Sequence, residues 1–242
     1  MQKLQLDFID DRSIINLRLE NADNTWSVVG GCSFEGVAMS KETTRDALLE
    51  AGRRIFLERG YNHSGIEAIL QVAGVPRGSF YYYFENKEDF GLQVLDRFVD
   101  RFTAEIDRHL SDPNLSPLER LRRLSESTCE KLESQQCRNG CLVGNLSQEL
   151  ADQNEAFRVR LEEIFLGWAE RFATCIRQAQ AVGEISDRID ARELADFWLN
   201  AWQGSILRAK TLRSTAPLRT FVHVMFGFVI GLPSRQDTST CN

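Results

Sequence analysis

Residues 73–90, AGVPRGSFYYYFENKEDF, constrain the fold of this chain more than any other stretch. A glycine turn at Gly74 leads to Pro76, which suits the first turn of a helix because an N–H there would have no intrahelical partner. The short helix predicted from Pro76 to about Phe84 carries a cluster of polar and aromatic side chains, Arg77, Ser79, Tyr81, Tyr82 and Tyr83. Three consecutive tyrosines cannot all face inward from one helix. The segment therefore predicts an exposed, phenol-rich helix.

A second short helix is predicted just before it, from Ser64-Gly65 to Gly74. Two short helices joined by a tight turn are typical of the helix-turn-helix, whose second helix enters the DNA major groove. On such a surface hydroxyl groups donate to phosphates, and Arg77 donates to a guanine edge. The alternative is a plain helical hairpin with an aromatic core stripe.

Apolar periodicity after Met39 predicts helices and no strands, and therefore an all-α protein. The expected helices span about 43–60, 65–73, 76–84, 86–110, 117–136, 141–152, 155–182, 190–212 and 216–231. The two prolines at 113 and 117 mark the best domain boundary. We expect an N-terminal three-helix helix-turn-helix domain over 41–101 (helix-turn-helix about 65–84), a C-terminal helical ligand-binding and dimerisation domain over 115–232, and a polar tail over 233–242.

Residues 1–38 do not follow this pattern and form a non-conforming N-terminal extension. Two interpretations stay open: a real arm, or a start codon placed too early, with Met39 as the true initiator. We favour the second as a hypothesis. A peptide from residues 1–38 in the native protein would refute it.

The net charge of −6 argues against a general polyanion binder. Even residues 40–90 hold seven Lys and Arg against eight Asp and Glu, so DNA contact must depend on a few placed cations. Six cysteines and three histidines show no zinc spacing, so we expect no metal site and no cofactor. No apolar run is long enough to span a membrane and no signal peptide is evident, which makes the cytoplasm the expected location.

The two last predicted helices are unusually apolar. The final one is hydrophobic nearly all round from Phe221 to Ile230, and the helix before it carries Trp198, Trp202 and Gly204. Such helices must be buried, either in their own core or in a partner. A two-fold four-helix interface would bury them, so the pattern favours a homodimer over the alternative of a monomer core.

The runs RDALLEAGRRIFLERGYN and IEAILQVAGVPRGSFYYYFENKEDF resemble the DNA-binding domain of the TetR/AcrR family of bacterial transcriptional regulators, over about residues 44–92. The resemblance implies a one-component regulator, usually a repressor, that binds double-stranded palindromic operator DNA as a homodimer and is released by a small-molecule effector. It places DNA contacts on the recognition-helix residues Arg77, Gly78, Ser79, Tyr81, Tyr82 and Tyr83, with Lys87 on a backbone phosphate. Many members have Thr or Ser where this chain has Gly65, and Ser64 is expected to take over that phosphate contact.

The stretch CRNGCLVGNLSQELA, residues 137–151, resembles a subgroup of the family that responds to electrophiles or unsaturated carbonyl compounds. Cys141 is predicted at a helix N-terminus, where the helix dipole lowers a thiol pKa, and Cys137 is a candidate resolving partner. The alternative for both is ordinary packing of a small apolar side chain.

If the thiols are not sensors, we expect a neutral or apolar effector in an aromatic pocket. The candidate lining residues are Phe157, Leu161, Ile164, Phe165, Trp168, Phe172, Trp198 and Trp202, and for each residue taken singly ordinary core is the favoured alternative. Two other functions are weighed: a cysteine-based redox enzyme, and a helical interaction protein without DNA binding. Neither cysteine has a nearby histidine or acid in the sequence, so we expect no enzyme.

Overall fold

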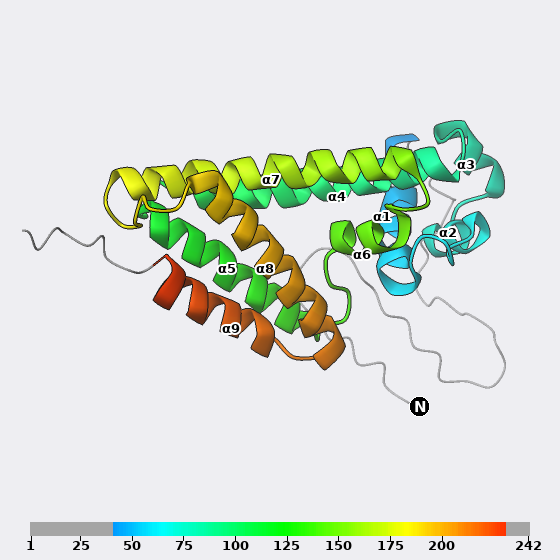
Figure 1. Ribbon diagram of the computed structural model, residues 1–242. Helices are drawn as coiled ribbons and strands as arrows, with labels where there is room; N and C mark the ends of the chain where they lie inside the picture. Colours follow the sequence, from blue (N-terminus) through cyan, green and yellow to red (C-terminus); the bar gives the residue numbers. More distant parts are fainter. Residues whose placement is uncertain (1–40, 231–242) are drawn as a thin grey trace, which may run out of the picture. The chain divides into compact units, whose positions relative to one another are not determined.

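The computed structural model describes residues 41–230, and the predictions for residues 1–38 and for the tail from 233 lie outside this range. Between residues 41 and 230 the chain forms helices and no strands, which confirms the all-α prediction (Figure 1). The helices are α1 (Lys41–Arg59), α2 (Ile66–Ala73), α3 (Arg77–Tyr83), α4 (Lys87–Leu110), α5 (Pro117–Ser134), α6 (Leu142–Leu150), α7 (Glu155–Ala181), α8 (Ala191–Leu212), α9 (Ala216–Val224) and the π-helical turn η1 (Met225–Val229).

The helix starts follow from local capping chemistry. Asn86 accepts a hydrogen bond from the N–H of Asp89 at 2.9 Å, and Asn154 accepts from the N–H of Phe157 at 3.0 Å. Asp190 caps α8 in the same way, accepting from the N–H of Arg192 at 2.8 Å. Each side chain pairs a main-chain N–H that has no partner inside its helix. The predicted start at Asn86 is therefore confirmed.

Phe90, in the first turn of α4, is the centre of the aromatic core beneath α1–α3. Its ring centroid lies 5.1 Å from that of Phe80 and 4.8 Å from that of Phe84, and Phe56 of α1 lies 6.0 Å away. These four rings are buried. Burial of Phe80 and Phe84 fixes which side of α3 faces the core, and therefore which side faces solvent.

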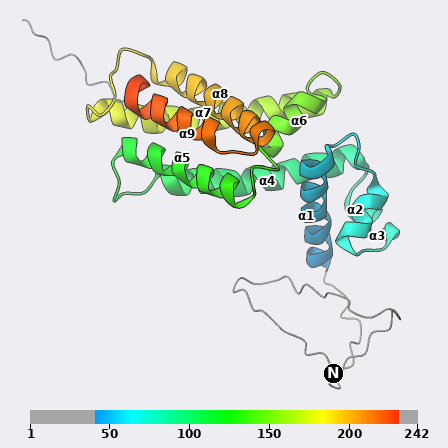
Figure 2. The same cartoon turned by 90° about the horizontal axis from the view of Figure 1, so that it is seen from below.

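The longer helices form the second part of the fold. In Figure 1 α4 and α7 lie side by side, and Figure 2 shows α9 along α8 and α5. Trp198 of α8 anchors this core, with ring centroids 5.9 Å from Phe172, 6.3 Å from Trp202 and 5.3 Å from Phe226. The last predicted helix, 216–231, is interrupted, because α9 ends at Val224 and widens into η1.

Candidate nucleic-acid interface, dimer face and effector cavity

The outer face of α3 presents aromatic and polar groups to solvent. Tyr81 is 56% exposed and Tyr82 is 63% exposed, and Tyr83 is half-buried with its ring 4.8 Å from that of Tyr82. Gly78 is exposed, and a Cβ added there would meet no atom within 4 Å, so another molecule could approach the backbone closely. The structure thus brings the predicted recognition-helix residues to one surface.

Arg77 begins α3 and is exposed. Its Nη1 lies 3.1 Å from Oε1 of Glu67, in the first turn of α2. An exposed ion pair of this kind contributes only ~0–1 kcal/mol, so the guanidinium can exchange this carboxylate for a DNA group. Glu67 was not anticipated from the sequence, since a pair between two helices has no local spacing that reveals it.

The expected role of Ser64 is wrong. Gly65 occupies the N-cap of α2, whereas the Ser64 side chain is fully buried and its hydroxyl donates to the carbonyl oxygen of Gly60. That hydroxyl is directed into the protein and is not presented to a phosphate. Gly65 itself is exposed with open space around its Cα, so only main-chain groups are offered at this position.

Lys87 is half-buried and already has partners within the chain. Its Nζ donates to the main-chain oxygen of Tyr61 at 2.8 Å and lies 4.3 Å from the centre of the Tyr61 ring. Burial lowers the pKa of the Lys87 ammonium, and the negative charge of Glu149 partly opposes that effect. The ammonium keeps donors beyond the one given to Tyr61, but it is not the free surface cation that the sequence suggests.

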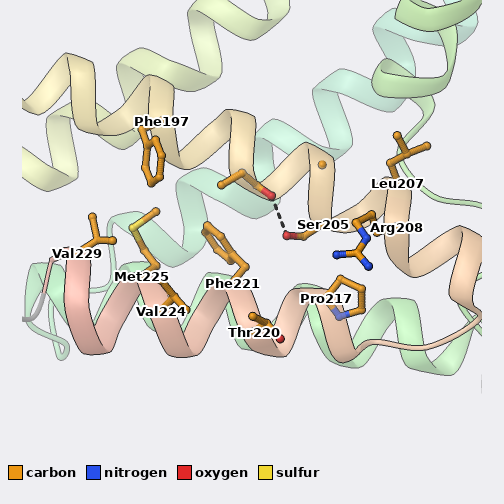
Figure 3. Close-up of a pocket in the computed structure, with 12 residues that line it drawn as sticks. Phe197, Ser205, Leu207, Arg208, Pro217, Thr220, Phe221, Val224, Met225 and Val229 are labelled. Atoms are coloured by element: carbon orange, nitrogen blue, oxygen red, sulfur yellow. Dashed lines mark hydrogen bonds between the residues drawn. The ribbon is translucent and has the colours of Figure 1, made fainter.

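A groove of about 500 Å³ runs between α8 and α9 (Figure 3). Phe197 is 53% exposed and points into the groove, and Leu207 and Val224 are also exposed there. Gly204 adds a position where a Cβ would meet nothing. Phe221 and Met225 also line this groove but are themselves buried, and Phe226 and Ile230 are buried in the protomer's own core. Both alternatives drawn from the sequence, monomer core and partner interface, are therefore compatible with α8 and α9. Part of the pair packs in the protomer's own core, while Phe197, Leu207 and Val224 are exposed.

A second cavity, of about 320 Å³, lies among five parts of the chain that are far apart in sequence. Its apolar lining includes Phe98 and Phe102 of α4, Leu132 of α5 and Ile206 of α8. Its polar lining includes Arg53 of α1, Arg101, Glu105, Lys131, Cys141 and Gln203. Lys131 pairs with Glu105 at 2.7 Å. This volume is at the lower end for small-molecule sites, and the lining is more polar than the sequence predicted.

Cys141 is the N-cap of α6 and belongs to this cavity, with Gln203 donating toward its sulfur at 3.6 Å. The expectation of a lowered pKa is wrong. Burial raises the pKa of the Cys141 thiol, and this outweighs the N–H of Gly144, the Gln203 amide and the N–H of Val143, which all favour the thiolate. The helix N-terminus is present, but removal from water is the larger effect.

The other proposed effector residues do not meet at this cavity. Cys137 is buried and does not line it, and the four described cysteines are free thiols. Trp168, Trp198 and Trp202 are buried, and the Trp168 indole N–H donates to Thr103 at 3.0 Å. Phe165 is half-buried and borders a different hollow beside Gln203. Apart from Phe165, the residues expected to line an aromatic pocket are therefore packed core.

Within residues 41–230 no cluster of His, Cys, Asp or Glu could hold a metal ion. Over the same part of the chain, no helix is both long and apolar enough to cross a membrane.

Comparison with known proteins agrees with this arrangement. Residues 48–94 match the family described as "Bacterial regulatory proteins, tetR family", and residues 117–225 match "Tetracyclin repressor-like, C-terminal domain". The chain is 39% identical over 201 residues to the HTH-type transcriptional repressor DhaR of Mycobacterium sp. (strain GP1), covering 83% of this chain and 98% of DhaR. It is 41% identical over 176 residues to the transcriptional regulator AcuR of Cereibacter sphaeroides, covering 72% of this chain and 80% of AcuR.

Solved structures show the same fold. The crystal structure of regulatory protein TetR from Rhodobacter sphaeroides has a TM-score of 0.73 and 39% identity, covering 76% of this chain and 97% of that one. Escherichia coli NemR in its reduced form has a TM-score of 0.71 and 26% identity, covering 78% and 98%. The chain belongs to the TetR family of bacterial DNA-binding transcriptional regulators.

Proposed function

We propose that the protein is a homodimeric repressor that binds a palindromic operator through α3 and is released when a small molecule occupies the cavity at Cys141. The observation that carries the DNA-binding part is the division of α3 into two sides. Phe80 is buried on the aromatic core, while Arg77, Tyr81 and Tyr82 face outward. A helix held rigidly from behind can present donors to a groove with little loss of side-chain and backbone freedom on binding.

Dimerisation supplies affinity that one module lacks. Residues 40–90 carry no excess of positive charge, so a single module gains little from counterion release. Two copies joined along α8 and α9 would place two recognition helices on successive major-groove faces, about 34 Å apart in a palindromic site. The groove lined by Phe197, Leu207 and Val224 is the surface that we assign to the partner. Since a regulator of this kind acts on chromosomal DNA, we assign it to the bacterial cytoplasm, in association with the nucleoid.

The DNA proposal is tested by footprinting the protein on the DNA that flanks its own gene. We expect two protected half-sites related by an inverted repeat and separated by about one helical turn. Protection of one unpaired site, or uniform protection with no sequence preference, would contradict the proposal.

The effector proposal rests on the position of the cavity. Arg53 belongs to α1 of the helix-turn-helix domain, whereas Lys131, Cys141 and Gln203 belong to the C-terminal half. A ligand there contacts both halves and can favour one arrangement over the other. Near-complete switching requires a difference of ~5.5 kcal/mol between the two states.

Two routes of release are separated by one variant, Cys141→Ser. If release requires covalent modification, the variant binds operator normally but no longer responds to a mild electrophile such as N-ethylmaleimide. If release requires only reversible binding, filling the cavity by Gln203→Trp weakens operator binding and Cys141→Ser changes nothing. Normal operator binding by Gln203→Trp together with normal electrophile release by Cys141→Ser would exclude this cavity as the effector site.

A further inference from the structure

Helix α6 joins the Cys141 cavity to the helix-turn-helix. Its N-cap, Cys141, lines the cavity, and its last turn carries Glu149. The eight steps between these residues span about 12 Å along a helix. A single short helix therefore connects the cavity to Glu149.

Glu149 holds the turn between α1 and α2. Its Oε2 accepts from the N–H of Tyr61 at 2.8 Å, and its Oε1 accepts from the N–H of Asn62 at 2.6 Å. Both carboxylate oxygens are thus hydrogen-bonded to main-chain donors of the DNA-binding domain. Charge-assisted bonds of this kind are about twice as strong as neutral ones and fix orientation as well as position.

The turn is shaped to receive this carboxylate. Gly60 has φ +81°, and a Cβ added there would lie 2.8 Å from Oε2 of Glu149. Tyr61 is buried with its ring 5.2 Å from that of Phe157 on α7, and burial followed by the charges of Glu88 and Glu149 raises the pKa of Tyr61 to about 12. In addition to the two bonds with Glu149, the side-chain amide of Asn62 donates a hydrogen bond to Gln153, just after α6, at 3.2 Å.

We infer that Glu149 is the positioning residue through which occupancy of the Cys141 cavity reaches the recognition helix. This inference rests on the proposed function, because it takes the cavity as the effector site. A shift of α6 displaces the N–H groups of Tyr61 and Asn62 through the carboxylate. The turn then moves the start of α2, at Ile66, and with it α3. The Lys87 bond to the Tyr61 oxygen joins the first turn of α4 to the same movement.

The test is a double-mutant cycle that needs no known effector. Cys141→Phe fills the cavity permanently, and Glu149→Gln keeps the side-chain size while placing an NH₂ group against one of the two main-chain donors. The matched control is Asp152→Asn, which removes an exposed acid just beyond α6 that forms no ion pair in the described chain. Thermal unfolding confirms that each variant is folded.

We expect Cys141→Phe to weaken operator binding by about tenfold in the wild-type and Asp152→Asn backgrounds, and by less than about twofold in the Glu149→Gln background. A merely structural role would lower operator affinity in the Glu149→Gln protein but leave the factor due to Cys141→Phe unchanged. An equal factor in all three backgrounds overturns the inference.

Amide hydrogen exchange in α2, measured without DNA, separates this inference from the proposed function. We expect Cys141→Phe to accelerate exchange of the α2 amides when Glu149 is present and to leave it unchanged in the Glu149→Gln background. If Cys141→Phe does not change the exchange rates of the α2 amides when Glu149 is present, the coupling is overturned even if the protein binds operator. If Cys141→Phe accelerates α2 exchange only when Glu149 is present, but the protein binds no operator, the coupling is supported and the proposed function alone is refuted.

Discussion

Phe197→Ala should weaken the dimer by about a thousandfold. The Phe197 ring is 53% exposed and points into the groove between α8 and α9. Since a buried Phe covers ~150–250 Å², the exposed part is roughly 100 Å². At ~25 cal/mol per Å², burial of this exposed area by a partner contributes about 2.5 kcal/mol, and the ring that Phe197→Ala removes accounts for roughly 2 kcal/mol of it. A two-fold interface uses the residue twice, so the loss is about 4 kcal/mol, or ~10³ in Kd.

The assay is sedimentation equilibrium over nanomolar to micromolar protein. The matched control is Val72→Ala, which truncates a similarly exposed apolar side chain (45%) on α2, away from the groove. Wild type and Val72→Ala should dimerise equally, and Phe197→Ala should dissociate at concentrations where they do not. A Phe197→Ala dimer as tight as wild type would show that the partner does not cover this groove.

Three further predictions concern stability and reactivity. Gly52→Ala should lower the unfolding free energy by ~1–3 kcal/mol, because the new Cβ would clash with the Phe90 ring, 2.7 Å from its Cε1. The control Gly167→Ala, whose Cβ would have its nearest neighbour at 3.7 Å, should be neutral or stabilising. Equal melting temperatures for the two variants would contradict this prediction. Gln136→Gly should raise stability by up to ~1 kcal/mol in urea unfolding, since Gln136 has φ +53°, and a loss of stability would show that this backbone is not strained. The rate at which iodoacetamide alkylates Cys141 should be lower than that for free cysteine at pH 7.5 and should still increase with pH above pH 9. The reason is that the raised pKa keeps the Cys141 thiol neutral until more alkaline pH. A rate that reaches a plateau below pH 8 would refute the effect of burial.

The fold was predictable because its signals are local. The Gly74 turn, Pro76 and the Asn86 cap set the limits of α3 and α4 within a few neighbouring residues, and the Phe80–Phe84 spacing determines the inner side of α3. Those features also placed the exposed tyrosines correctly.

The cavity that we propose as the effector site was not predictable for the opposite reason. Its polar residues come from α1, α4, α5, α8 and the start of α6, so no spacing in the sequence brings Arg53, Lys131 and Gln203 together. Trp168, Trp198 and Trp202 were expected to line a pocket but are packed in the core. Apolar periodicity does not distinguish a cavity wall from a packed core. Ser64 and Cys141 were misjudged because burial decides what a hydroxyl or thiol can do.

The most direct test of DNA reading by α3 is the ratio of affinities for the operator and for a scrambled duplex, measured by fluorescence anisotropy at one salt concentration. Arg77→Ala should lower this ratio by about 5- to 150-fold, the range expected for losing one bidentate base contact. Arg123→Ala, which removes an exposed arginine of α5, should leave it unchanged. An unchanged ratio in Arg77→Ala would contradict the assignment of α3 as the recognition helix.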